Sequence, residues 1–279
     1  MARLLEVSTS GYYKRAKGSA TTELTERQQR KADLSVRIVE HHRDSGGTYG
    51  SPRITADLRA AGEQVSEKTV AKIMAEIGLA GISPRTFKVR TTVVDPSASF
   101  PADLVERRFD QGRPDAVWSS DITYLTCGEG DMYLCAIRDE HSKRVLGWSV
   151  ADHMLTELVT DALAQAVAVR AGNVGGTIMH SDRGTQYTAQ AMVKACVDAG
   201  LRRSMGATGI CWDNSGAESL WSTFKHEYYY RHTFATKAEI VAAVDKWMHF
   251  YNTHRRHSVI GMLSPIAYEQ SLDAVTQAA

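Results

Sequence analysis

Several features are scarce in this chain, and each absence excludes a class of protein. It has no run of about 18 or more apolar residues and no secretory leader, so we expect a cytoplasmic protein without a membrane span. The four cysteines, Cys127, Cys135, Cys196 and Cys211, lack CxxC spacing, which argues against a disulfide framework or a zinc site. A net charge of only +1 excludes a polycation, so any binding to nucleic acid must come from local patches.

The composition is otherwise that of an ordinary globular protein. Hydrophobic residues make up 43% of the chain and charged residues 23%. A chain of 279 residues is long enough to bury a sizeable core and to form two domains.

Three carboxylates stand out because of the segments around them. Asp121 interrupts an apolar, β-branched run, where a solvated surface acid is unexpected. Asp182 follows a short apolar run and precedes Gly184 in a turn, and Glu218 lies on a predicted helix after a gap of 35 residues. Acids at strand ends in an α/β pattern lie where such sheets place their ligands.

These residue types suit divalent-metal chemistry on a phosphodiester. Mg²⁺ prefers carboxylate and water oxygens. Two ions about 3.5–4 Å apart can activate an attacking oxygen and stabilise a leaving one. Because the chain has 32 acids, spacing alone is a weak argument, and it is the strand-end context that favours one metal site formed by Asp121, Asp182 and Glu218.

Long motifs around the three acids occur in a characteristic order. They are WSSDITY at Asp121, HSDRGTQY at Asp182 and, after the 35-residue gap, DNSGAESLWSTFKHE at Glu218. From about Ser35 to Glu269 the chain resembles the DDE transposases of bacterial insertion sequences, chiefly the second-frame (OrfB) product of the IS-three family, whose core is similar to retroviral integrases. The resemblance implies a ribonuclease H-like integrase catalytic core. It also implies Mg²⁺ dependence, with two ions per active site and Mn²⁺ as a substitute, and strand transfer at the ends of the element.

Hydrophobic periodicity predicts an α/β fold, a mixed five-stranded sheet with flanking helices. The expected strands are 117–127, 132–138, 144–150, 177–180 and 201–204. The expected helices are 156–171, 188–199 with Thr188 as its cap, and one from Asn214 towards Tyr230. This order matches the ribonuclease H-like core and places Asp121 on the central first strand with Asp182 next to it.

Upstream, a small all-helical domain is predicted to be a helix-turn-helix. Ser66 is a good N-cap for a helix that ends at Gly78, and a tight turn from Gly62 precedes it. The second helix of such a pair enters the major groove of DNA with its N-terminal residues, here Lys68, Thr69 and Lys72. The alternative is a helical packing domain whose lysines are merely solvated.

The expected segments are an N-terminal piece at 1–30, the helix-turn-helix domain at 31–84, a linker at 85–113, the catalytic core at 114–230 and a C-terminal helical extension at 231–279. Further candidates for DNA contact are Arg183, Lys225, Arg255 and Arg256. Lys225 lies two turns after Glu218 and is expected on the same helix face. Trp221 and Phe224 are read as core residues.

The sequence thus predicts a transposase that cleaves DNA and transfers strands. Its expected partners are double-stranded DNA, as terminal inverted repeats and target, other copies of the chain, and an upstream first-frame protein to which it is fused or bound. A nuclease without strand transfer and a DNA-binding regulator are the alternatives.

Overall fold

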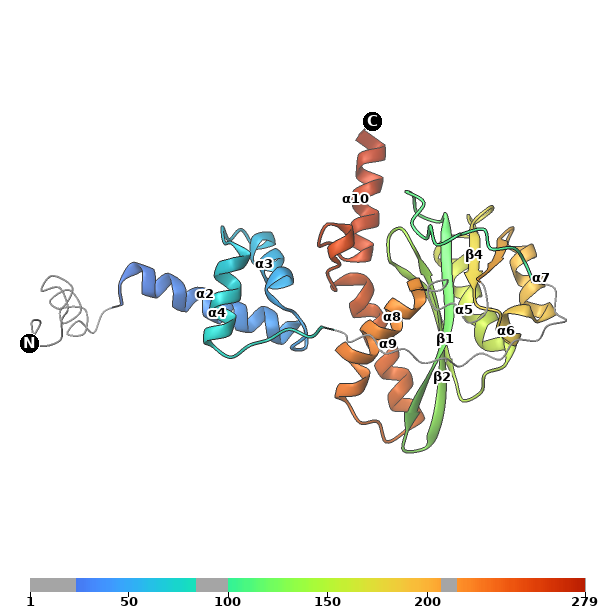
Figure 1. The fold of residues 1–279 in the computed structure, drawn as a ribbon, viewed down its shortest axis with the longest axis horizontal. Helices are drawn as coiled ribbons and strands as arrows, with labels where there is room; N and C mark the ends of the chain where they lie inside the picture. The colour runs from blue at the N-terminus through green and yellow to red at the C-terminus, as the bar shows by residue number, and fades with distance from the viewer. Residues whose placement is uncertain (1–23, 84–99, 207–214, 279) are drawn as a thin grey trace, which may run out of the picture. The chain divides into compact units, whose positions relative to one another are not determined.

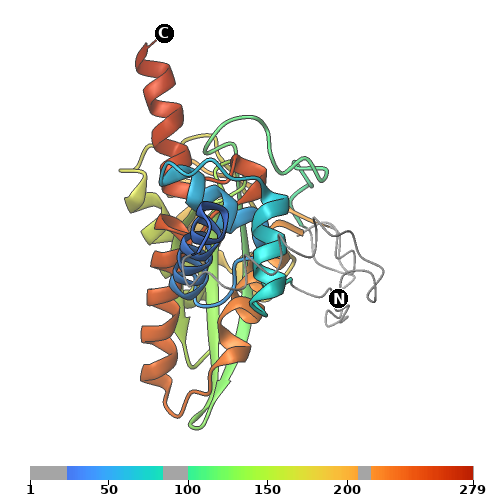
Figure 2. The same cartoon turned by 90° about the vertical axis from the view of Figure 1, so that its left-hand side faces the viewer.

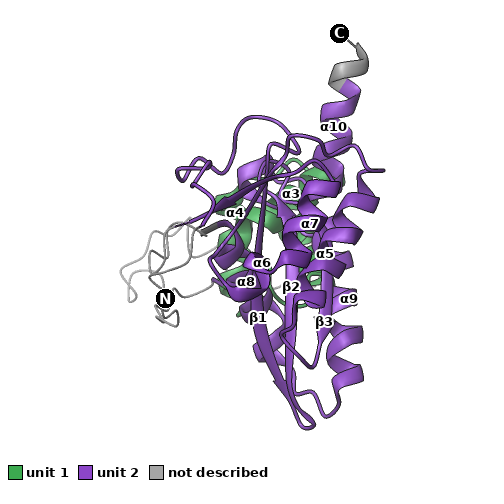
Figure 3. Ribbon diagram, turned by 90° about the vertical axis from the view of Figure 1, so that its right-hand side faces the viewer, with its two compact units in different colours: residues 1–82 green, residues 83–279 purple. Residues whose placement is uncertain are grey.

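The structure is a computed structural model that describes residues 24–83, 100–206 and 215–278. The chain divides into two compact units, Met1–Ile82 and Ser83–Ala279, coloured separately in Figure 3. No helix in the described part of the chain combines the length and apolar character needed to cross a bilayer.

The described residues of the first unit form the helices α2 (Glu26–Asp44), α3 (Ser51–Ala60) and α4 (Glu67–Glu76). Their apolar faces share one core that includes Ile38, Ile54, Leu58 and Val70. The first two turns of α2 are polar, and its buried residues begin only at Leu34. A capping box between Thr25 and Gln28 starts the helix.

The predicted pair of helices α3 and α4 is present, with its turn. Gly62 has a φ of 86°, a left-handed conformation that favours glycine, and Ser66 caps α4 by accepting a hydrogen bond from the Thr69 amide at 3.2 Å. Val70, Ile73 and Met74 of α4 are buried. These features confirm a helical, helix-turn-helix-like domain.

The second unit is built on a five-stranded sheet in the order β3-β2-β1-β4-β5. Its strands are β1 (Val117–Cys127), β2 (Gly130–Asp139), β3 (Val145–Ala151), β4 (Ile178–Ser181) and β5 (Arg202–Met205). β1, β2 and β3 form an antiparallel meander, whereas β4 and β5 run parallel to β1. The predicted mixed sheet of a ribonuclease H-like core is therefore confirmed.

Helices cover both faces of this sheet (Figure 1). The helices are α5 (Thr156–Val169), α6 (Thr185–Thr188), α7 (Gln190–Asp198), α8 (Ser215–Glu227), α9 (Lys237–Thr253) and α10 (Pro265–Ala278), with 3₁₀ turns η2 (Tyr229–Arg231) and η3 (Ser258–Ile260). Cys135 and Ile137 of β2 point into a core shared with α5 and α7, and Leu134 and Ala136 point into a second core shared with α8 and α9. The two-residue period of a strand produces this division.

Two predicted details are wrong. Thr188 does not cap the helix after β4, because residues 185–188 form the short helix α6 and Ala189 is the N-cap of α7. The helix that carries Glu218 ends at Glu227 rather than Tyr230, and η2 follows it. The expected cap at Asn214 lies outside the described residues.

The linker predicted at 85–113 is described from Phe100 onwards, and that part packs on the sheet of the second unit. Val105 is fully buried with Val117 and Ile178, and the Leu104 amide donates to Ser204 Oγ at 2.9 Å. The β1–β2 hairpin extends well past the short strand β4 (Figure 1), and the perpendicular view in Figure 2 shows the same long hairpin. Among the described residues, no strand pairs with this edge of β1 beyond Ser119.

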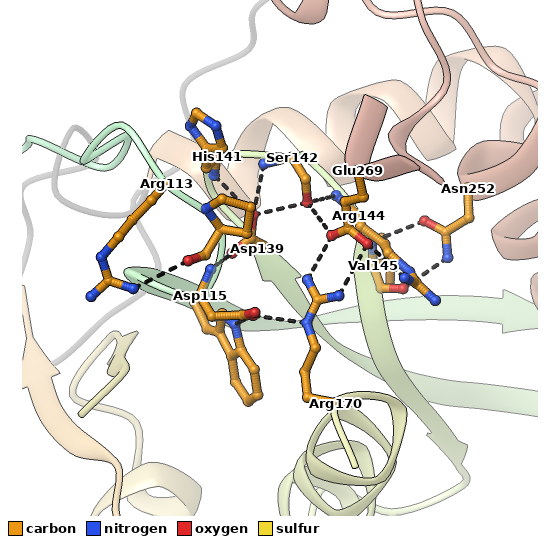
Figure 4. Close-up of polar contacts among 12 residues, drawn as sticks. Arg113, Asp115, Asp139, His141, Ser142, Arg144, Val145, Arg170, Asn252 and Glu269 are labelled. Carbon is orange, nitrogen blue, oxygen red and sulfur yellow. Dashed lines mark hydrogen bonds and ion pairs between the residues drawn. The ribbon is translucent and has the colours of Figure 1, made fainter. Parts of the chain in front are cut away.

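A polar network joins α10 to the sheet and to α5 (Figure 4). The Glu269 carboxylate accepts from Arg170 Nη2 at 2.6 Å, from Arg144 Nη1 at 2.6 Å and from Ser142 Oγ at 2.8 Å. Burial would raise the pKa of Glu269, but the two guanidinium groups and Ser142 hold it below its usual value. Asn252 of α9 exchanges two hydrogen bonds with the Val145 backbone in the same region.

We expect Glu269→Gln to lower the free energy of unfolding by about 2 kcal/mol, because two guanidinium groups lose their charged partner. Urea unfolding followed by circular dichroism measures this. The matched control is Asp198→Asn, which removes the charge of an exposed ion pair with Lys194 and should change stability by less than about 0.5 kcal/mol. Equal effects of the two substitutions would contradict the prediction.

Candidate active site

The pairing of two parallel strands brings Asp121 and Asp182 level with each other. In β1 and β4, Val117 pairs with Ile178 and Ser119 with His180, an offset of 178 − 117 = 61 positions. The same offset carries Asp121 to 121 + 61 = 182, two residues beyond the last pair. Asp182 directly follows the end of β4, so the register places it near Asp121, and its charge acts on that residue.

Helix α8 lies against the side of β1 from which Asp121 projects. Asp121 Oδ2 accepts a hydrogen bond from Trp221 Nε1 at 3.2 Å, and its Oδ1 accepts from the Ile122 amide at 2.8 Å. Trp221 and Phe224 are buried between α8, β1 and α9, which confirms them as core residues. Glu218, one helical turn before Trp221, is exposed.

The pKa values of all three acids are raised, and the charges of Asp182 and Glu218 both act on Asp121. Burial raises the pKa of Asp121 to about 7, and the negative charges of Asp182 and Glu218 also raise it, against the hydrogen bonds from Ile122 and Trp221. Burial raises the pKa of Asp182 as well, although the Gly184 amide donates to its Oδ1 at 2.9 Å. Partial desolvation raises the pKa of Glu218. The charges of Asp182 and Glu218 repel that of Asp121, and a bound cation would reduce this repulsion.

A buried ion pair lies under the first turn of α8. Glu140, at the end of β2, accepts from Arg138 Nη2 at 2.9 and 3.0 Å and from the Ser119 hydroxyl. A Cβ on Gly216 would lie 2.4 Å from Glu140 Oε1, so only glycine allows the helix to approach this carboxylate so closely. The fold thus sets the height of Glu218 through Gly216, two residues before it.

Lys225 lies on α8, as Glu218 does, and its charge interacts with that of Asp121. Its ammonium group is 4.8 Å from the centroid of the Tyr124 ring. Burial lowers the pKa of Lys225, and the charge of Asp121 opposes that shift, so the cation and the acid are close. The sequence-based placement of Lys225 on the Glu218 side of the helix agrees with this environment.

The remaining arginine candidates for DNA contact differ in their burial and in the groups that they contact. Arg183 is partly buried, with its guanidinium carbon 4.6 Å from the Phe100 ring centroid. Arg255 does not fit the predicted role of a phosphate contact, because its side chain is buried and its guanidinium binds Glu227 with two hydrogen bonds of 2.7 Å. Arg256 is only partly buried, and it donates to the Met262 carbonyl at 2.8 Å.

In the helical unit, the predicted DNA-contact residues lie on the exposed face of α4. Lys68, Thr69 and Lys72 are all exposed. The Thr69 hydroxyl lies 2.9 Å from Ser66 Oγ and so is partly engaged by the cap of its own helix.

Sequence reasoning missed two neighbours of the acids. It placed Trp221 in the core but not on Asp121, although Glu218, Trp221 and Lys225 recur at the three- and four-residue spacing of one helix face. Glu140 gave no signal, because its role depends on Gly216, which is 76 positions further along the chain (216 − 140 = 76). Within the described residues, the acids are not yet gathered into a ready-made cluster of three or more metal ligands.

Comparison with known proteins agrees with this architecture. Residues 111–211 and 199–265 each match an integrase core domain, and residues 28–87 match an HTH-like domain. A core of this kind, with acids level on adjacent strands, defines a polynucleotidyl-transferase-type enzyme.

Two similar proteins are named as transposases, and they show to which family of enzymes the chain belongs. The chain is 34% identical over 272 residues to the transposase InsF for insertion sequence IS3A of Escherichia coli, covering 96% of this chain and 92% of the relative. It is 35% identical over 245 residues to the transposase for insertion sequence element IS629 of Shigella sonnei, covering 88% and 81%. The chain belongs to the family of insertion-sequence transposases, and its function is DNA transposition and integration.

One solved structure is similar at a lower level. The catalytic core domain of BIV integrase shares 18% identity and a TM-score of 0.43, covering 59% of this chain and 98% of that chain. The family assignment depends on the sequence relatives and not on this structural similarity.

The raised pKa of Asp121 predicts a pH-dependent cost to stability in the absence of divalent ions. Because the folded protein holds the proton more tightly than the unfolded chain, stability is highest at low pH and is lost as the pH rises through about 7. Asp121→Asn should therefore stabilise the protein in EDTA by about 2–4 kcal/mol at about pH 8, and by less at about pH 5. Urea unfolding at both pH values tests this, with the exposed Asp161→Asn as control. The same gain at both pH values would refute the explanation.

Proposed function

We propose that Asp121, Asp182 and Glu218 are the catalytic acids of a DDE site that cleaves and joins DNA at the ends of an insertion sequence. The observation that carries the proposal is the common height of Asp121 and Asp182 on adjacent strands, with the charge of Glu218 acting on Asp121. The supporting motifs surround the same three residues.

The donor set fits hard divalent cations. Three carboxylates whose pKa values are raised by burial offer only oxygen ligands, which Mg²⁺ and Mn²⁺ accept. Asp121, Asp182 and Glu218 would hold these ions, and Asp121 is the acid on which the charges of both others act. When bound, such ions would supply the positive charge that stabilises the transferring phosphate.

The residues of this chain would otherwise act by positioning. Trp221 and the Ile122 amide hold the Asp121 carboxylate in one orientation, and the Gly184 amide holds Asp182. Lys225 is placed to bind a phosphate beside the acids. In strand transfer the 3′-hydroxyl oxygen of the element forms a new bond to a target phosphorus, the bond to the target's own 3′ oxygen breaks, and the hydroxyl proton passes to solvent.

DNA recognition is assigned to the helical unit. Lys68 and Lys72 on the exposed face of α4 would contact the terminal inverted repeats, with Thr69 beside them, and Arg183 and Arg256 are further candidates near the catalytic unit. Because transposition joins two ends, we further propose that copies of the chain assemble on DNA, with an upstream first-frame protein as a fused or bound partner.

The acids are tested by strand transfer. Purified protein is incubated with Mg²⁺ and a labelled pre-cut end bearing a free 3′-hydroxyl. We expect Asp182→Asn and Glu218→Gln each to reduce joined product by roughly a thousandfold, because several kcal/mol of charge stabilisation are lost. The control Asp161→Asn should join ends normally. Joining that survives both active-site substitutions would disprove the assignment, and cleavage without joining in the wild type would indicate a nuclease.

The helical unit is tested by the salt dependence of DNA binding. If Lys68 and Lys72 each neutralise a phosphate, their replacement by alanine should reduce the slope of log affinity against log salt by about 1 each. The control is Lys194→Ala, which removes an exposed lysine of α7 that pairs with Asp198. An unchanged slope in both helix α4 variants would exclude these contacts.

A further inference from the structure

Two exposed tyrosines, one on β1 and one on η2, have no part in the chemistry described so far. Tyr124 follows Asp121 by three residues on β1 and is 65% exposed, and Tyr230 of η2 is 62% exposed. Most of the large aromatic side chains around them are wholly or partly buried, including Trp221, Phe224 and Tyr229. The exposure of both rings at one place therefore needs a reason.

Contacts along β1 bring η2 to the same edge of the sheet as Tyr124. The Tyr229 hydroxyl accepts from the Thr126 amide at 2.7 Å and donates to the Thr126 carbonyl at 3.0 Å. Tyr229 and Tyr230 have ring centroids 5.5 Å apart, and the His226 ring meets Tyr230 edge-on at 5.5 Å. Lys225 of α8, next to His226, has its ammonium 4.8 Å from the centroid of the Tyr124 ring, so the end of this helix links the two tyrosines.

The edge on which these rings lie is open and leads to the acids. β4 pairs with β1 only from Val117 to Ser119, and within the described residues no strand pairs with β1 on that side beyond Ser119. Tyr229 uses the backbone groups that this edge leaves available at Thr126. A DNA end that reaches Asp121 would have this edge beside it.

The chemistry of the patch suits a nucleotide that has left the duplex. Tyrosine rings offer faces on which any base can stack, without hydrogen bonds that would read its identity. Lys225, whose ammonium lies 4.8 Å from the Tyr124 centroid and near Asp121, adds a cation at the distance of a neighbouring phosphate. Aromatic faces combined with a cation are typical of surfaces that bind single-stranded nucleic acid.

We propose that Tyr124 and Tyr230 form a stacking platform that holds an unpaired base of the DNA next to the acids. This inference rests on the proposed function, because it takes the acids as the place where the DNA is processed. The platform would hold the frayed end of a strand while its terminal phosphodiester lies at Asp121 and Asp182.

The test compares two DNA ends that differ only in an unpaired nucleotide. The affinity of the full-length protein for a blunt duplex end and for the same end with a short single-stranded tail is measured by fluorescence anisotropy in EDTA. We expect Tyr124→Ala and Tyr230→Ala to weaken binding of the tailed end by about five- to a hundredfold, the range of a lost base–aromatic stack. Binding of the blunt end should change little.

Matched variants separate stacking from other effects. Tyr124→Phe and Tyr230→Phe keep the ring and should bind the tailed end like the wild type, and Val197→Ala removes an exposed apolar side chain on α7 as a surface control. Loss of affinity in the phenylalanine variants would point to the hydroxyl groups and overturn the proposal. Equal weakening of tailed and blunt ends would also overturn it, since it would indicate a general contact with the duplex.

The outcome is independent of the catalytic assignment. If the alanine variants bind tailed ends like the wild type while Asp182→Asn abolishes joining, the platform is disproved and the proposed function stands. If Asp182→Asn joins ends normally, the proposed function fails, and the affinities measured without divalent ions still decide whether the tyrosines hold an unpaired base.

Discussion

The parallel pairing of β4 with β1 is the constraint on which the site depends. The offset of 61 positions makes Asp121 and Asp182 level. A slip of one residue would turn one of the two carboxylates to the opposite face of the sheet. The pairing is held from both faces, because Trp118 and Met179 lie in one apolar core while Val117 and Ile178 lie in another. The geometry of the acids is thus a consequence of how the core packs.

The third acid depends on how α8 is held. At its beginning Gly216 lies against the buried Glu140–Arg138 pair, and at its end Glu227 binds the buried Arg255. Buried ion pairs contribute little net stability after desolvation, but breaking one by removing a single partner is costly. Two such pairs oppose a shift of the helix along β1, and this fits a residue such as Glu218 that must reach acids on a different element.

The charge of Asp121 opposes the stability of the fold. Burial and the repulsion from Asp182 and Glu218 raise the pKa of Asp121 to about 7, so its ionisation destabilises the folded protein. Perturbed carboxylates of this kind are common where a protein binds cations or transfers protons. The rest of the unit offsets the cost with well-satisfied contacts remote from the acids, of which the Glu269 network is one.

Local patterns in the sequence determined much of this protein. Alternation in β1 and β2, the cap at Ser66 and the helical spacing of Val70, Ile73 and Met74 each depend on near neighbours, so the strands and the helix-turn-helix were predictable from residues alone. Only the tertiary structure decided which arginine side chains are exposed and which are buried in ion pairs. Arg255 and Arg256 are adjacent and alike in sequence, yet Arg255 is buried against Glu227, 28 positions away, whereas Arg256 remains partly exposed. Likewise, η2 lies at the β1 edge because the Tyr229 hydroxyl forms hydrogen bonds with the Thr126 backbone. The energy of such contacts belongs to pairs distant in the chain, which no local pattern records.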